Sequence, residues 1–477
     1  MKTIVTFPIC FLLGLAVLFP QTIQFAPYEF KNDKGAIVEA EMGSLQVPEN
    51  RNNPSTRMIT LKMVRFKSTN PNPSAPIIYL AGGPGGSGIS TARGKRFDLF
   101  MELRDIADVI ALDQRGTGLS SDIPRCSTDS KMSLEEPGTF ESYLEVMHES
   151  SEQCLGFWIG EGIDINGYNT IENAKDIDAL RQALGVERIN LWGISYGSHL
   201  GFAYSKLFED RVEKMVMASL EGPNETIKLP KNNESYLERL NLALKKDTLA
   251  YSKYGNLQEL MRAALDSLRR KPVQTTFFDG RSNKEIKVGI SDFDLKLVTS
   301  YFLTKNPEDA SALPLIYHEV LNGKFDRLVQ MVAGMKKYAN RVRLMPLVAD
   351  VASGVSVARH ELITKQSKTS ILSGTTNFPY PDIGEGLGIE DLGTEYRKPF
   401  KSKARALFFS GTLDGRTYLE SATNIVADFK NATHITVDGA GHDLYTSSPE
   451  IIELMKSFLS GEMVKSKTIK VKIQAFR

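Results

Sequence analysis

The sequence carries almost no excess charge of either sign. Its 58 Lys and Arg residues nearly balance 57 Asp and Glu residues, leaving a formal net charge of +1. No overall electrostatic field therefore favours nucleic acid or an anionic membrane as a partner. Cysteine and histidine are also scarce, with three and six residues, and we expect no metal site and no cofactor. The 42% apolar content is that of a soluble globular protein with a large core.

The N-terminal apolar run, residues 4–19, is too short and too interrupted by proline for a comfortable transmembrane helix. Lys2 precedes this run and a polar stretch follows it, as in a secretory signal peptide. We therefore predict a signal peptide over 1–26, with Ala16 and Ala26 as candidate cleavage positions. The mature protein would be exported, periplasmic or secreted, without stable membrane insertion. An uncleaved membrane anchor is the alternative.

Cleavage of this leader would remove Cys10 and leave two cysteines, Cys126 and Cys154. Two cysteines in an exported protein most simply form one disulfide. From the residues alone, two unpaired buried thiols remain the alternative.

Short apolar segments alternate with helical patterns along much of the chain. They are found at 77–80, 109–112, 189–192, 215–218, 406–409 and 434–437. Fully apolar strands that alternate with helices predict a parallel sheet covered on both faces. Two further segments, 37–47 and 58–66, predict an antiparallel pair near the N-terminus.

The alternation stops between about residues 223 and 403, where the pattern becomes mainly helical. Apolar residues recur at helical spacing over 257–268 and 313–335, and Asp279-Gly280 predicts a hairpin turn. We therefore divide the chain into the leader, a core whose two parts are 27–222 and 404–477, and an inserted region over 223–403.

The segment Gly193-Ile194-Ser195-Tyr196-Gly197 follows one of the apolar strands. A serine between two glycines at a strand-to-helix turn is the G-x-S-x-G pattern, in which a strained backbone holds the hydroxyl clear of the strand end. By itself the pattern is weak, because glycine-rich turns are common. Its weight depends on the segments that accompany it.

Four further loops follow predicted strands, at the end where open α/β sheets place functional residues. Residues 81–88, A-G-G-P-G-G-S-G, can aim bare N–H groups at a developing oxyanion. A phosphate cradle is disfavoured there, because no Lys-Ser/Thr completes it. Residues 113–120 contain Asp113 and Arg115, which could pair and brace the loop, and we expect this segment to support the site.

The other two loops, 411–417 and 439–443, supply Asp414 and His442. A carboxylate in the first loop could orient a histidine in the second and stabilise its imidazolium. The chain order Ser195, Asp414, His442 is the order expected when a G-x-S-x-G serine is the nucleophile. The combination is therefore much stronger than any of its parts.

Together the five loops resemble the α/β-hydrolase fold and, more narrowly, the prolyl iminopeptidase and tripeptidyl aminopeptidase family of serine peptidases. The segment 176–185, just before the strand that leads to the serine, also matches that family. The resemblance implies an α/β fold with a mostly parallel, doubly wound sheet. It also implies that the inserted region is a mainly helical cap over the active site.

Carried over residue by residue, the resemblance makes Ser195 the nucleophile, His442 the general base and then acid, and Asp414 its orienting partner. The oxyanion hole would consist of the backbone N–H groups of Gly83 and Tyr196. No part of this machinery needs a metal ion.

The resemblance also concerns residues outside the triad. Cys126 and Cys154 resemble a cysteine pair in exported members, which favours the disulfide. Ala81 stands where prolyl iminopeptidases usually have histidine, a departure that leaves the substrate open. Glu221 follows the strand 215–218, where related proteins often have an acidic residue. We expect it to hold a substrate's protonated α-amine, or alternatively to brace the hinge of the cap.

The resulting interpretation is an exported serine exopeptidase, an aminopeptidase that hydrolyses short peptides from the amino end through an acyl-enzyme on Ser195. An esterase or another small-acyl hydrolase is the alternative, because the same triad serves both. A non-catalytic binding protein is disfavoured, since the triad and the glycine loop occur together. The partner is then a short peptide substrate, with no nucleic acid, and the oligomeric state is left open.

Overall fold

A ten-stranded sheet forms the centre of the protein, in the order β1-β2-β3-β5-β4-β6-β7-β10-β11-β12. The computed structural model describes residues 23–280 and 282–477, so most of the predicted signal peptide lies outside it. The strands are β1 (Gln24–Lys31), β2 (Ile37–Pro48), β3 (Met58–Phe66), β4 (Ile77–Leu80), β5 (Val109–Leu112), β6 (Ile189–Ile194), β7 (Val212–Ala218), β10 (Ala406–Gly411), β11 (Ala432–Asp438) and β12 (Lys467–Lys470). Neighbours from β5 to β12 pair in parallel, whereas β1, β2 and β3 form an antiparallel edge.

The antiparallel edge begins earlier than the sequence pattern indicates. Strand β1 starts at Gln24 and pairs with β2, so its first three residues fall within the range 1–26 that we assign to the leader. Its alternating, largely exposed residues gave no clear apolar run. Among the described residues, no helix has the length and apolar character needed to cross a membrane.

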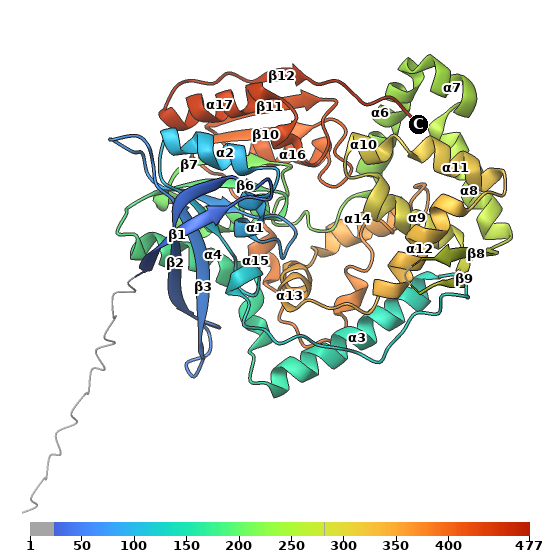
Figure 1. Ribbon diagram of the computed structural model, residues 1–477, viewed down its shortest axis with the longest axis horizontal. Helices are drawn as coiled ribbons and strands as arrows, with labels where there is room; N and C mark the ends of the chain where they lie inside the picture. Colours follow the sequence, from blue (N-terminus) through green and yellow to red (C-terminus); the bar gives the residue numbers. More distant parts are fainter. Residues whose placement is uncertain (1–22, 281) are drawn as a thin grey trace, which may run out of the picture.

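Helices cover both faces of the sheet, as expected for fully apolar strands (Figure 1). One face packs against α4 (Thr170–Ala183), α5 (Tyr196–Phe208) and α16 (Leu419–Ala427), and the other against α1 (Gly88–Arg93), α2 (Phe97–Glu102) and α17 (Pro449–Ser460). Successive strand residues enter opposite cores: Leu191 packs on the first face and Trp192 on the second, and both are fully buried. Because the central strands are buried on both faces, a shift of one residue would move their apolar side chains to the wrong core, so their register is fixed.

The cap lies between β7 and β10 and has a hydrophobic core of its own. Its elements are α6 (Pro230–Lys246), α7 (Thr248–Tyr254), α8 (Leu257–Arg270), β8 (Val273–Asp279), β9 (Lys284–Ile290), α9 (Asp292–Val298), α10 (Pro307–Ala310), α11 (Leu313–Leu321), α12 (Asp326–Tyr338), α13 (Leu344–Ser353), α14 (Val357–Ser367) and α15 (Gly393–Arg397). The helical pattern over 313–335 is two helices, because the chain turns at Gly323 with a φ of 69°.

Two segments from outside the insertion hold the cap, which the division at residues 222 and 404 does not anticipate. Helix α3 (Phe140–Gly160) lies along the cap in Figure 1, and the Tyr143 hydroxyl donates to Asp294 over 2.8 Å. The tail after β12 crosses to the cap on the other side, where the Phe476 N–H donates to Asp247 over 3.2 Å. The cap is therefore held by helix α3 on one side and by the C-terminal tail on the other.

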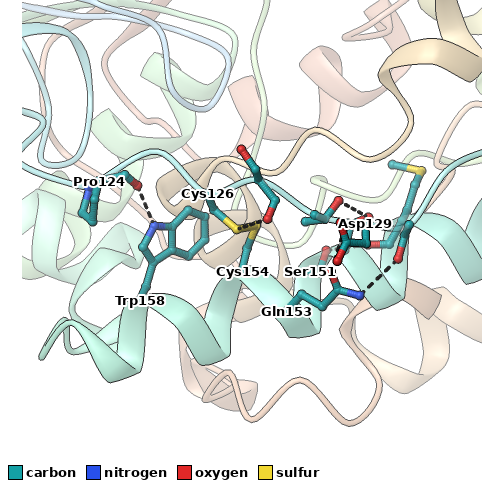
Figure 2. Close-up of a disulfide and its surroundings, with 12 residues drawn as sticks. Pro124, Cys126, Asp129, Ser151, Gln153, Cys154 and Trp158 are labelled. Carbon is teal, nitrogen blue, oxygen red and sulfur yellow. Dashed lines mark hydrogen bonds between the residues drawn. A yellow bond between two sulfur atoms is a disulfide. The ribbon is translucent and has the colours of Figure 1, made fainter.

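A disulfide joins Cys126 to Cys154 on α3 (Figure 2). Nearby, the Trp158 indole N–H donates to the carbonyl of Pro124 over 2.9 Å. These two links fasten the loop after β5 to the helix that supports the cap. The sequence predicted this pairing, and the structure contains it.

Removing both sulfurs in a Cys126→Ala/Cys154→Ala variant should lower the free energy of unfolding by about 3 kcal/mol, because the loop closes over a separation of 28 residues. Urea denaturation of the oxidised protein and the variant measures this. An unchanged midpoint, or two free thiols at Cys126 and Cys154 in the purified protein, would contradict it.

Candidate active site

Ser195 occupies the turn between β6 and α5 with φ 57° and ψ −128°, a conformation that non-glycine residues rarely adopt. The flanking glycines make the turn possible. A Cβ on Gly197 would lie 2.0 Å from the carbonyl oxygen of Leu80, and one on Gly193 would lie 2.7 Å from the Gly197 carbonyl. The Ser195 N–H donates to the carbonyl of Ala218 over 3.1 Å, which anchors the strained residue to the next strand.

Asp414 and His442 meet at the carboxyl ends of β10 and β11. The His442 Nδ1 lies 3.0 Å from Asp414 Oδ2 and 3.1 Å from Oδ1. Asp414 is fully buried and also accepts from the Thr417 hydroxyl over 2.6 Å and the Arg416 N–H over 2.8 Å. Burial opposes its ionisation, but His442 and these donors hold the pKa of Asp414 below its ordinary value. The carboxylate is therefore held ionised against the imidazole.

The two neighbouring carboxylates have other partners. Asp443 forms an ion pair with Arg96, and Asp438 accepts from the Thr412 hydroxyl over 3.0 Å. Of the three candidates near His442, Asp414 is thus the one bonded to the ring.

Ser195 and His442 line one cavity of about 660 Å³, which lies between the sheet and the cap. Ser195 remains partly exposed to it, and His442 is almost fully buried. This volume is within the range of about 300–1,000 Å³ for small-ligand sites. The cavity therefore brings the predicted nucleophile and base to a common space.

The glycine loop lies directly against the serine turn. A Cβ on Gly82 would be 2.8 Å from the carbonyl of Ile194 and 3.1 Å from the Ser195 Cβ. Gly83 lines the cavity with a φ of 133°. Tyr196 is the first residue of α5, so its N–H has no carbonyl within the helix to bond. This arrangement is compatible with the oxyanion hole that we predict at Gly83 and Tyr196.

Asp113 and Arg115, which the sequence left free to pair, have other partners. Asp113 accepts from the Ser87 hydroxyl over 2.6 Å and so braces the glycine loop. Arg115 is fully buried and donates twice to Asp176 on α4, each over 2.7 Å. Both still support the site, through different neighbours.

Glu221 lines the cavity but already has a cationic partner. Its carboxylate forms an ion pair with Lys228, and its N–H donates to the Ser198 hydroxyl over 2.9 Å. Burial opposes the charge, but Lys228 and the nearby imidazole of His199 keep the pKa of Glu221 below its ordinary value. Glu221 is therefore an ionised group of the cavity wall at the hinge of the cap.

Asp350, on α13 of the cap, is a second acidic residue of the same cavity. Burial, and then the negative charge of Glu221, raise the pKa of Asp350 from 3.8 to about 8. Sequence reasoning missed it, because the residue sits in an ordinary helical pattern with no motif around it. Thr417 was missed for a different reason, since a threonine three residues after Asp414 gains meaning only when the loop is folded.

Fold and site together define the class of the protein. The family model for the alpha/beta hydrolase fold matches residues 75–250, and a second model, for TAP-like proteins, matches residues 393–467. The chain belongs to the α/β-hydrolase fold family, and its C-terminal part is similar to TAP-like proteins.

Characterised relatives carry corresponding names. The chain is 30% identical over 213 residues to the serine protease Hip1 of Mycobacterium tuberculosis, covering 43% of this chain and 40% of that protein. It is 29% identical over 192 residues to tripeptidyl aminopeptidase of Streptomyces lividans, covering 39% and 36%. The chain thus spans about two fifths of the length of these relatives. An esterase from Exiguobacterium antarcticum, 14% identical, aligns over 87% of this chain and 98% of its own with a TM-score of 0.38, which carries no argument about function.

Replacing Thr417 by valine should lower kcat about tenfold and leave KM nearly unchanged, because Asp414 loses a hydroxyl donor and holds His442 less firmly. Thr417→Ser, which keeps the hydroxyl, should restore most of the rate. Steady-state kinetics of the two variants decide the matter. A serine variant as slow as the valine variant would show that the methyl group matters instead.

Asp350→Asn should stabilise the protein at alkaline pH. With a raised native pKa, Asp350 keeps a proton that the unfolded chain releases above pH 3.8, so its contribution to stability is lost as the pH rises towards about 8. The variant should gain about 1–3 kcal/mol over the wild type at pH 8 and little near pH 4. Denaturant melts across this window test it, with Glu259→Gln on the exposed face of α8 as control. An equal gain in stability at pH 4 and pH 8 would show that the effect does not come from the raised pKa of Asp350.

Proposed function

We propose that this protein is an exported serine aminopeptidase that hydrolyses short peptides from their amino end. The observation that carries the proposal is the common cavity, onto which the strained Ser195 and the Asp414-bound His442 both open. The relatives named a serine protease and a tripeptidyl aminopeptidase support a peptide as substrate. The disulfide supports an oxidising destination, as the predicted leader does.

In this mechanism His442 takes the proton of the Ser195 hydroxyl as the oxygen attacks the scissile carbonyl carbon. The N–H groups of Gly83 and Tyr196 stabilise the oxyanion of the tetrahedral intermediate. His442 then returns the proton to the leaving amine, and the peptide's amino-terminal part remains as an ester on Ser195. Water, deprotonated by His442, hydrolyses that ester. Asp414 stabilises the imidazolium in both halves of the reaction.

The acidic residues of the cavity explain why the amino end would be the end that is bound. Lys228 neutralises Glu221 through an ion pair. Asp350 is a second carboxyl group close enough to Glu221 to feel its charge, and it has no ion pair of its own among the described residues. Burial raises the pKa of Asp350, and the negative charge of Glu221 raises it further, so a cation placed beside these two groups would favour the ionised form of Asp350. A substrate's α-ammonium group would provide that cation and would bind by charge-assisted hydrogen bonds. Glu221 would then act together with Asp350.

Glu221→Gln should reduce kcat/KM for peptides with a free amino terminus by about 1.5–3 kcal/mol, because the ammonium loses a charged partner. N-acetylated peptides and simple esters should respond far less. Fluorogenic peptidyl amides in free and acetylated form measure the difference, and Glu259→Gln is the matched exposed control.

Ser195→Ala should abolish every one of these activities, with a loss on the order of a millionfold in kcat. A serine-directed phosphonate should label Ser195 in the wild type. If simple esters are hydrolysed and free peptides are not, the small-acyl hydrolase is the better description. Equal losses on free and acetylated substrates would make Glu221 a brace of the cap hinge.

A further inference from the structure

Cations outnumber carboxylates on the wall of the catalytic cavity. Within residues 23–280 and 282–477, six Lys and Arg side chains line it, against three Asp and Glu side chains. Two of the cations are neutralised by direct ion pairs, Arg96 with Asp443 and Lys228 with Glu221. The remaining charges do not balance.

Four cations form no direct ion pair among the described residues, although the charges of two of them, Lys305 and Arg416, act on Asp443 and Asp350: Lys305, Arg341, Arg343 and Arg416. Against them stands Asp350, whose raised pKa of about 8 leaves it largely protonated near neutral pH. The wall of the cavity is therefore electropositive. A substrate with an ammonium group alone would add to this positive charge, whereas a carboxylate on the same substrate would offset part of it.

The unpaired cations differ in how they are held. Arg341 and Arg343 are exposed, on the loop before α13. The Arg341 guanidinium lies 3.8 Å from the centre of the Tyr338 ring, and Arg343 Nη1 is 3.5 Å from the carbonyl of Gly85 in the glycine loop. Both guanidinium groups keep donors for a ligand, since each has five.

Lys305 lies beside the loop that carries His442. Its backbone carbonyl accepts the N–H of His442 over 3.0 Å, and its side chain is exposed on the cavity wall. Because His442 delivers the proton to the leaving amine, the part of a substrate beyond the scissile bond passes close to this imidazole. A negative charge on that part would meet a cationic surface.

We propose that Arg341, Arg343 and Lys305 form a carboxylate-recognition site that reads the leaving part of the substrate. The ligand is either the C-terminal carboxylate of a short peptide or an acidic side chain after the scissile bond. Arginine suits this role because its planar donors match a carboxylate in a bidentate manner. This inference rests on the proposed aminopeptidase function, since it places the amino end against Glu221 and Asp350 and the negative charge at the opposite end.

The test compares peptides that differ only in charge at the carboxyl end. Alanine peptides of increasing length, each as the free acid and as the C-terminal amide, are incubated with the full-length mature enzyme, and the products are quantified by mass spectrometry. At the best length we expect the free acid to be favoured by about five- to tenfold in kcat/KM. The preference should shrink in about 1 M salt. A second series of amides, with Glu or Gln after the scissile bond, distinguishes an acidic side chain from a terminal carboxylate.

The double variant Arg341→Gln/Arg343→Gln should bring the ratio of acid to amide close to one. Arg270→Gln, an exposed arginine of α8 outside the cavity, should leave that ratio as in the wild type. A wild-type ratio near one in both series would overturn the inference, and so would a preference that survives in the double variant. Failure of the aminopeptidase proposal itself looks different: neither acid nor amide is cleaved, although the phosphonate labels Ser195.

Discussion

The close approach of two backbone turns, at Gly82 and at Ser195, is the constraint on which the site depends. Strands β4 and β6 are hydrogen-bonded neighbours, so their carboxyl ends deliver the glycine loop and the serine turn to one point. The turns meet so tightly that a Cβ on Gly82 would lie 2.8 Å from the Ile194 carbonyl. A buried sheet with helices on both faces can hold such contacts, because no strand can slip without exposing its apolar residues.

The Asp414–His442 bond depends in the same way on two neighbouring strands. Strands β10 and β11 pair in parallel, so their carboxyl ends bring the two loops together. Here the cost of burying a carboxylate is offset by its donors. The Thr417 hydroxyl donates to one carboxylate oxygen and the backbone N–H groups of Arg416 and Thr417 donate to the other, so both oxygens that contact the imidazole have further donors. Charge and geometry are therefore set by one short loop, whose conformation is fixed by the strands on which it stands.

The cap contributes a different kind of control, because it determines which charges face the reacting groups. It supplies Asp350, Arg341 and Arg343 to the cavity, whereas the core supplies Ser195 and His442. Helix α3 and the C-terminal tail, which both bond to the cap, keep these charges in place above the sheet. The chemistry thus belongs to the core, and the selection of substrate, as we propose it, belongs to the relation between cap and core.

Sequence patterns by themselves determined the fold class, the alternation of strands and helices, and the presence of an insertion. They also predicted the triad residues Ser195, Asp414 and His442. They did so because each of these features is local: an apolar strand, a glycine-flanked serine, or a polar loop at a strand end. The count of cysteines also favoured a bond between Cys126 and Cys154, although two free thiols remained the alternative until the fold showed the disulfide.

The tertiary structure alone decided which side chains become partners across long distances. It separated Asp113 from Arg115 and gave them Ser87 and Asp176. It also paired Glu221 with Lys228 and added Asp350 to the cavity wall. No periodicity or motif encodes such pairings, because they depend on how the cap is seated on the sheet. Burial and the distances between charges, which set the pKa of Asp350, exist only once that packing is complete.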